Sequence, residues 1–264
     1  MKLGFIGTGN MASAIIGAVI EEKIATPDEI YGADVFAPGR ERVQKQFGIN
    51  VTPDNLEVVK NVDMMVLSVK PQYYGDVINQ IKDAIRPDQI VITIAPGKTL
   101  DWLGEQFGKE VKIVRTMPNT PAMVSAGMTA MCPNKNITEE DAKKVRCMLE
   151  SFGLVEQVPE HLMDTVTAVS GSAPAYVYMF IEEMADAAVS GGMPRQQAYK
   201  FAAQAVLGSA KMVLDTGKHP GELKDMVCSP AGTTIEAVRV LEKRGFRSAV
   251  FEAVKVVEEV SKQM

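Results

Sequence analysis

The sequence has little of what marks several common protein classes. Its 264 residues include only three cysteines, two histidines and 6% aromatic residues, and 33 acidic residues outnumber 28 lysines and arginines, for a net charge of −5. Because the chain has no block of consecutive basic residues, it offers no surface that would neutralise a phosphate backbone or an anionic membrane. We therefore expect neither nucleic acid nor a membrane among its partners.

Cysteine usage and hydropathy exclude further classes. Cys132, Cys147 and Cys228 are odd in number and scattered, with no C-x-x-C pair, a pattern that indicates neither a disulfide framework nor a zinc site. We predict no metal. The longest apolar stretch near the start, residues 3–20, is interrupted by glycine, asparagine and serine, so it predicts neither a signal peptide nor a membrane span. We expect a cytoplasmic protein.

The first 160 residues alternate strand-like and helix-like segments. This alternation is typical of a doubly wound, Rossmann-type parallel sheet with right-handed crossovers. Thr138 is suited to cap the last of these helices, with Asp141 in the capping-box position. The predicted strands are 2–6, 29–34, 63–69, 90–94, 112–115, 126–132 and 154–158, and the predicted helices are 12–22, 40–47, 74–85, 100–107 and 138–152.

The remaining residues read as helices only, at 173–190, 194–215, 220–227, 233–243 and 246–262. The segment 175–188 is apolar on most of its circumference, and a helix of that kind must be buried. This favours an obligate helical dimer interface, with a self-contained bundle as the alternative. We predict two domains, a dinucleotide-binding domain over residues 1–160 and an all-α dimerisation domain over 161–264.

A glycine loop separates the first predicted strand from the first predicted helix. Residues 7–12 read Gly-Thr-Gly-Asn-Met-Ala, which fits the G-x-G-x-x-[G/A] pattern. One glycine serves the tight turn, the next lets backbone approach a pyrophosphate, and the small third residue packs the helix. The position after an apolar strand predicts dinucleotide binding, with Gly7, Thr8, Gly9, Asn10 and Met11 as cofactor-binding residues.

The end of the second strand gives conflicting signals about the cofactor. Asp34 favours NAD(H), because an acidic residue at this position hydrogen-bonds the ribose 2′-hydroxyl. Arg40 and Arg42 follow closely and could pair with a 2′-phosphate, although they read equally well as solvated helix residues. The sequence leaves the choice between NADP(H) and NAD(H) open.

Other strand ends carry further candidates, since ligands of open α/β sheets bind beyond the carboxyl ends of the strands. Lys70 can be a cofactor contact or a solvated cation held extended by the following proline. Asn119 lies between two prolines that would hold its amide rigidly near the nicotinamide. The candidates at these strand ends are Ser68, Val69, Lys70, Pro71, Ala95 and Asn119.

Five motifs together resemble one enzyme family over essentially the whole chain. They occupy residues 7–11, 69–71, 117–121, 169–176 and 224–234, and the last two are more specific than any glycine loop. The chain resembles pyrroline-5-carboxylate reductase. The resemblance implies reduction of 1-pyrroline-5-carboxylate to L-proline with NADPH or NADH, and a homodimer, which in this family often assembles into larger rings.

The resemblance also implies roles for individual residues. It assigns the substrate carboxylate to Ser229, Gly232 and Thr233, the ring nitrogen to Thr234 as the catalytic contact, and the adenosine ribose to Asn55. Ala231 departs from the pattern, since glycine is common there. The alternative for Ser229 and Thr233 is plain helix capping. Because an imine is basic enough to arrive protonated, the reaction needs no strong general acid, and His219 is expected to be structural.

Two other functions fit the sequence less well. A β-hydroxyacid dehydrogenase needs a lysine on the first long helix of its second domain, but residues 173–193 contain none. A dinucleotide sensor without turnover would tolerate a degenerate substrate loop, whereas every residue that the resemblance assigns to the substrate is present. The preferred cyclic imine and regulation by proline are not readable from residue types.

Overall fold

The computed structural model describes residues 1–263, so residue 264, the last of the predicted second domain, lies outside the described residues. The chain divides into two compact units. The first contains Met1–Ser172 together with the end of the chain from Val257 onward, and the second contains Ala173–Val256.

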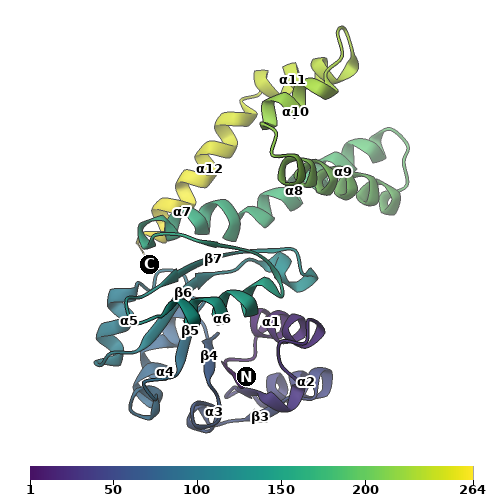
Figure 1. Cartoon of the computed structure of the whole chain (residues 1–264). Coiled ribbons are helices and arrows are strands. Elements are labelled where there is room, and N and C mark those ends of the chain that lie inside the picture. Colours follow the sequence, from purple (N-terminus) through teal and green to yellow (C-terminus); the bar gives the residue numbers. More distant parts are fainter. Residues whose placement is uncertain (264) are drawn as a thin grey trace. The chain divides into compact units, whose positions relative to one another are not determined.

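The first unit is built on one eight-stranded sheet with helices on both faces (Figure 1). Across the sheet the strands are β3 (Asn50–Thr52), β2 (Ile30–Ala33), β1 (Leu3–Ile6), β4 (Met64–Leu67), β5 (Ile90–Thr93), β6 (Lys112–Met117), β7 (Gly127–Pro133) and β8 (Gly153–Gln157). All neighbours are parallel except β6 and β7. The order from β3 to β6 is that of a Rossmann fold, as predicted.

The central strands β1, β4 and β5 are buried on both faces, which explains why a strand such as β4 reads as a continuous apolar run. Because successive strand residues point to opposite faces, Phe5 packs in one core and Ile6 in the other. The helices whose residues join the Phe5 core are α1 (Asn10–Glu21), α2 (Ala37–Phe47) and α6 (Glu139–Glu150), and those of the Ile6 core are α3 (Asn55–Asn61), α4 (Tyr74–Ile81) and α5 (Leu100–Phe107).

The structure corrects the sequence-based prediction between residues 47 and 63. Both β3 and α3 were missed, because three mostly polar residues and a seven-residue helix carry too little periodicity to stand out. Asp54 caps α3, with its side chain accepting from Leu56 N at 2.9 Å. In addition, α2 begins at Ala37 rather than at residue 40, with Pro38 in its first turn, and β6 extends to Met117.

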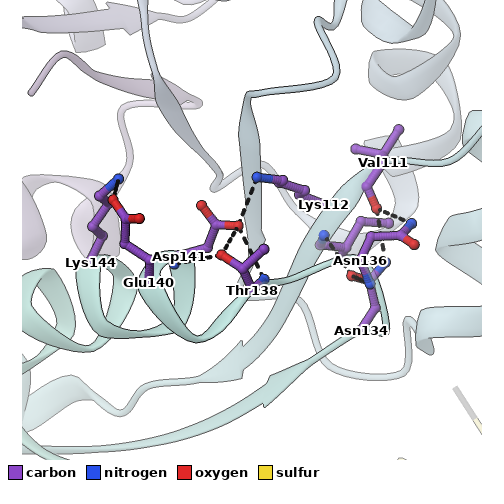
Figure 2. Close-up of polar contacts among 9 residues, drawn as sticks. Val111, Lys112, Asn134, Asn136, Thr138, Glu140, Asp141 and Lys144 are labelled. Atoms are coloured by element: carbon purple, nitrogen blue, oxygen red, sulfur yellow. Dashed lines mark hydrogen bonds and ion pairs between the residues drawn. The ribbon is translucent and has the colours of Figure 1, made fainter.

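The predicted cap of α6 is confirmed as a closed capping box (Figure 2). Thr138 N and Oγ1 donate to Asp141 Oδ2 at 3.1 and 2.8 Å, and Asp141 N donates to Thr138 Oγ1 at 3.2 Å. Lys112 Nζ lies 2.7 Å from the same Oδ2. Burial raises the pKa of Asp141, but the hydrogen bonds from Lys112 and Thr138 outweigh it and hold that pKa below its ordinary value.

A short helix, α7 (Met163–Val166), and a π-helical turn, Thr167–Gly171, close the first unit before α8 (Ala173–Ser190) begins. The second unit contains α8, α9 (Arg195–Thr216), α10 (Pro220–Val227), α11 (Thr233–Lys243) and most of α12 (Phe246–Ser261). Over the described residues no strand follows β8, as predicted, and no helix is both long and apolar enough to cross a bilayer.

The second unit exposes much of its apolar surface in the single chain. Its small core consists of Ala185, Ala198 and Ala202, where α8 packs on α9. Ala185 is the one buried residue of α8, whereas Tyr178 and Met179 are 59% and 65% exposed. For α8 to be buried as predicted, a second surface must therefore cover its exposed apolar side chains.

Candidate functional site

The carboxyl ends of neighbouring parallel strands bring several predicted site residues to one edge of the sheet. Gly7 follows β1, Asp34 follows β2, Ser68 follows β4, and Ala95 lies two residues beyond β5. The chain order reverses between β1 and β4, and open α/β sheets bind ligands at such a switch point. Ser68 Oγ ties the two strand ends together by donating to Gly7 O at 2.7 Å.

The two glycines of the loop are needed for different reasons. Gly7 has φ +98°, and a Cβ there would lie 2.8 Å from backbone atoms of Ser68 and Val69. Gly9 has φ −68° and open space where a Cβ would be. It caps α1, whose first turn has neither a side-chain cap nor an acidic residue. Free amides at an unshielded helix N-terminus suit a pyrophosphate, so the loop fits a dinucleotide.

The predicted ribose residue, Asp34, is held by the glycine loop. Its Oδ2 accepts hydrogen bonds from Thr8 N at 2.8 Å and Thr8 Oγ1 at 3.0 Å, and its Oδ1 accepts from Phe36 N at 3.0 Å. Arg40 Nη1 donates to Asp34 O at 2.5 Å. Arg42 Nη2 donates to Thr8 O at 2.9 Å and to Ser13 Oγ at 3.2 Å. Both arginines thus contact the protein's own backbone.

The remaining cofactor candidates lie on neighbouring segments. Asn55 is the first residue of α3, and its amide donates to Gln80 Oε1 at 2.8 Å. Asn119 is buried, and its side chain donates to Ser170 O at 3.1 Å and accepts from Met128 N at 2.9 Å. Lys70 is exposed and extended, with ψ 149°, as expected before Pro71. Asn119 therefore also ties the segment after β6 to the π-helical turn.

Tyr74, which was not predicted from the sequence, contacts the ends of two neighbouring strands. Tyr74 is fully buried, and its hydroxyl donates to Leu67 O at 2.5 Å and accepts from Ile94 N at 3.3 Å. Burial raises the pKa of this hydroxyl, which keeps its proton. It joins β4 to the end of β5 immediately before Ser68 and Ala95. A hydroxyl within an apolar helical stripe was its only signal in the sequence.

The predicted substrate loop leads into α11 in the second unit. Gly232 is the N-cap, and its N–H donates to Ser229 O at 3.0 Å. Ser229 Oγ occupies the space where a Cβ on Gly232 would stand. Because no side chain caps α11 and Thr233 is its first residue, helix capping by Ser229 or Thr233 does not hold. The first-turn amides are left for an anion.

Two neighbouring features of this segment have a structural explanation. Ala231 has φ +53°, a left-handed conformation that favours glycine, which explains why glycine is common at this position in the family it resembles. His219 caps α10, and its Nδ1 accepts from Gly221 N at 3.0 Å. The expected structural role of His219 is confirmed.

Comparisons with known proteins point to one family. The family described as "Pyrroline-5-carboxylate reductase dimerisation" matches residues 160–264, and that described as "NADP oxidoreductase coenzyme F420-dependent" matches residues 2–97. The chain is 52% identical to pyrroline-5-carboxylate reductase of Escherichia coli (100% of this chain, 98% of the relative). It is 45% identical to that of Methanosarcina acetivorans (100% and 97%).

Solved structures agree with these relatives. The structure of Plasmodium falciparum pyrroline carboxylate reductase with NADP bound matches with a TM-score of 0.91 at 35% identity, over 100% of this chain and 97% of that one. The 1-pyrroline-5-carboxylate reductase of Streptococcus pyogenes matches with a TM-score of 0.89 at 32% identity, over 100% and 99%.

Proposed function

Since the chain belongs to the pyrroline-5-carboxylate reductase family, we propose that its two candidate loops divide the work of reducing 1-pyrroline-5-carboxylate to L-proline. The chain is an NAD(P)H-dependent oxidoreductase that acts on a carbon–nitrogen double bond. It has a Rossmann-type domain and a helical dimerisation domain, and it forms a homodimer.

The glycine loop and its neighbours hold the dinucleotide. When bound, NAD(P)H supplies the hydride that reduces the imine carbon. The open amides at the start of α1 bind the pyrophosphate, and Asp34 and Asn55 face the adenosine ribose. Ser68 and Tyr74 fix the strand ends that flank the cofactor. The other residues of this site are Thr8, Asn10, Met11, Val69, Lys70, Pro71, Ala95 and Asn119.

The loop before α11 holds the substrate. The observation that carries this assignment is the uncapped first turn of α11, whose amides lack a side-chain acceptor. A carboxylate binds well at such a helix N-terminus, where both the amides and the helix dipole favour negative charge. Ser229, Gly232 and Thr233 bind the carboxylate, and the Thr234 hydroxyl accepts a hydrogen bond from the protonated ring nitrogen.

The loop orients the imine and supplies no strong acid. Because the substrate nitrogen is protonated on arrival, the protein's task is to hold the substrate in place and to neutralise its carboxylate.

We also propose a cytoplasmic location, where reducing conditions would preserve the free thiols of Cys132, Cys147 and Cys228. The homodimer would cover the exposed apolar surface of α8 and α9.

A substitution at Thr234 tests the substrate assignment. A hydrogen bond to a charged group is worth about 1.5–3 kcal/mol, so Thr234→Ala should lower kcat/KM for the imine roughly 10- to 100-fold. The dissociation constant for NADH, measured by calorimetric titration, should stay within about twofold of wild type, because Thr234 is assigned to the substrate.

The matched control is Thr234→Ser, which keeps the hydroxyl and should recover most of the activity. Unchanged turnover in Thr234→Ala would remove the residue from the reaction. An equal loss in both variants would show that the methyl group, and not the hydroxyl, matters.

A further inference from the structure

At the end of β2, Thr8 and the backbone of Phe36 hold the Asp34 carboxylate in a fixed position, while Arg40 and Arg42 contact the backbone of Asp34 and Thr8. We refer to Thr8, Asp34, Arg40 and Arg42 as the Asp34 cluster. Three hydrogen bonds from Thr8 and Phe36 reach the two carboxylate oxygens. Thr8 is 1% exposed, so the group that holds Asp34 is itself held by packing. The carboxylate is therefore preorganised at the strand end where a Rossmann fold reads the adenosine ribose.

The two arginines reinforce the cluster through contacts with its backbone. Arg40 donates to the carbonyl of Asp34, and Arg42 donates to the carbonyl of Thr8. In the described part of the chain, neither guanidinium forms an ion pair with the Asp34 carboxylate. The negative charge of Asp34 thus stays uncompensated by a direct contact, while both cations secure the backbone that positions it.

From this arrangement, and resting on the proposed dinucleotide site, we infer that the Asp34 cluster makes this chain discriminate against the 2′-phosphate and use NADH in preference to NADPH. A carboxylate only accepts hydrogen bonds and has about four lone-pair positions, of which three are used here. The remaining one suits a ribose 2′-hydroxyl, which can donate. A 2′-phosphate monoester carries about −1.5 to −2 charges at neutral pH, so it is repelled by the carboxylate and mainly accepts hydrogen bonds.

The preference does not follow from the family. A solved relative from Plasmodium falciparum holds NADP, and the family that matches residues 2–97 is described as an NADP oxidoreductase. The inference rests on this chain's own residues, because like charges fixed close together repel most strongly where neither can move away or be hydrated freely.

The test measures binding without turnover. Titration calorimetry of the full-length protein with NADH and with NADPH, in the same buffer and without imine, gives two dissociation constants. We expect NADH to bind at least about tenfold more tightly, which corresponds to about 1.4 kcal/mol. Asp34→Asn keeps the shape of the side chain and removes its charge, so the preference should fall to within about threefold, chiefly through tighter NADPH binding.

Thr8→Val is the matched control for loosening the loop. It removes one hydrogen bond to Asp34 and keeps the charge, so NADH should remain the preferred nucleotide. If Thr8→Val lost the preference as fully as Asp34→Asn, the discrimination would reside in the loop and the inference would be overturned.

The wild-type protein alone provides a decisive comparison that does not depend on any variant folding. NADPH binding as tight as NADH binding, or an unaltered preference in Asp34→Asn, would overturn the inference and leave the proposed reduction intact. Binding of neither nucleotide would overturn the dinucleotide site itself and the preference with it.

Discussion

Replacing each glycine of the β1–α1 loop by alanine should separate folding from binding. At Gly7, φ is +98° and an added Cβ would lie 2.8 Å from the backbone of Ser68 and Val69. The strained conformation costs about 1–3 kcal/mol. The clash adds to this, because the neighbouring atoms belong to the backbone just after β4 and cannot rotate away. We expect Gly7→Ala to lower the free energy of unfolding by about 2–4 kcal/mol.

Gly9→Ala should behave differently. The backbone at Gly9 already has φ −68° and nothing lies within 4 Å of the new methyl group. The loss of a glycine N-cap and the lower entropy of the unfolded chain oppose each other, so stability should change by less than about 0.5 kcal/mol. The methyl group would nevertheless stand where backbone must approach the pyrophosphate, and NADH affinity should fall at least about tenfold.

Urea unfolding measures the stability of the two variants, and calorimetric titration measures NADH binding. We expect Gly7→Ala to lose both stability and NADH binding, and Gly9→Ala to lose binding alone. Unimpaired nucleotide binding by Gly9→Ala would refute the assignment of this loop to the pyrophosphate. Equal destabilisation of both variants would refute the distinction between the two glycines.

Two further substitutions probe the scaffold. Asp141→Asn should cost about 1 kcal/mol of stability at neutral pH through the weakened capping box. Since the pKa of Asp141 is held below its ordinary value of 3.8, the carboxylate contributes fully above that pH and less as pH falls below it. Unfolding curves of wild type and variant should converge in acid, and a constant difference would contradict this. Tyr74→Phe leaves Leu67 O and Ile94 N without their partner, so it should cost about 1–2 kcal/mol in urea unfolding and raise the KM for NADH more than it lowers kcat. Unchanged stability and KM would show that the Tyr74 hydroxyl does not position the strand ends.

The parts of the fold that sequence could predict are those with strong local signals. Runs such as 63–69 predict buried strands because both faces of the sheet are covered, and the Thr138 cap follows from residue types alone. The strand β3 and helix α3 were not predicted because they are stabilised by pairing with β2 and by packing on the sheet, and their sequences carry no clear hydrophobic periodicity. The antiparallel pairing of β6 with β7 is likewise a long-range property.

In the candidate site, too, local sequence signals could be recognised and long-range contacts could not. The glycine loop and the substrate loop are each one continuous stretch of sequence, so both could be recognised from the sequence alone. The hydrogen bonds of Asp34 to Thr8 join residues 26 apart in the chain, and those of Tyr74 connect two different strands. Which groups the arginines contact depends on side-chain placement, so residue types alone left their role open.

The most direct test of the central claim is the oxidation of NADH and of NADPH by the purified protein, followed at the nicotinamide absorbance with and without 1-pyrroline-5-carboxylate. We expect oxidation that depends on the imine, with L-proline as the product. Absence of imine-dependent oxidation with either nucleotide, in a folded protein that binds one of them, would contradict it.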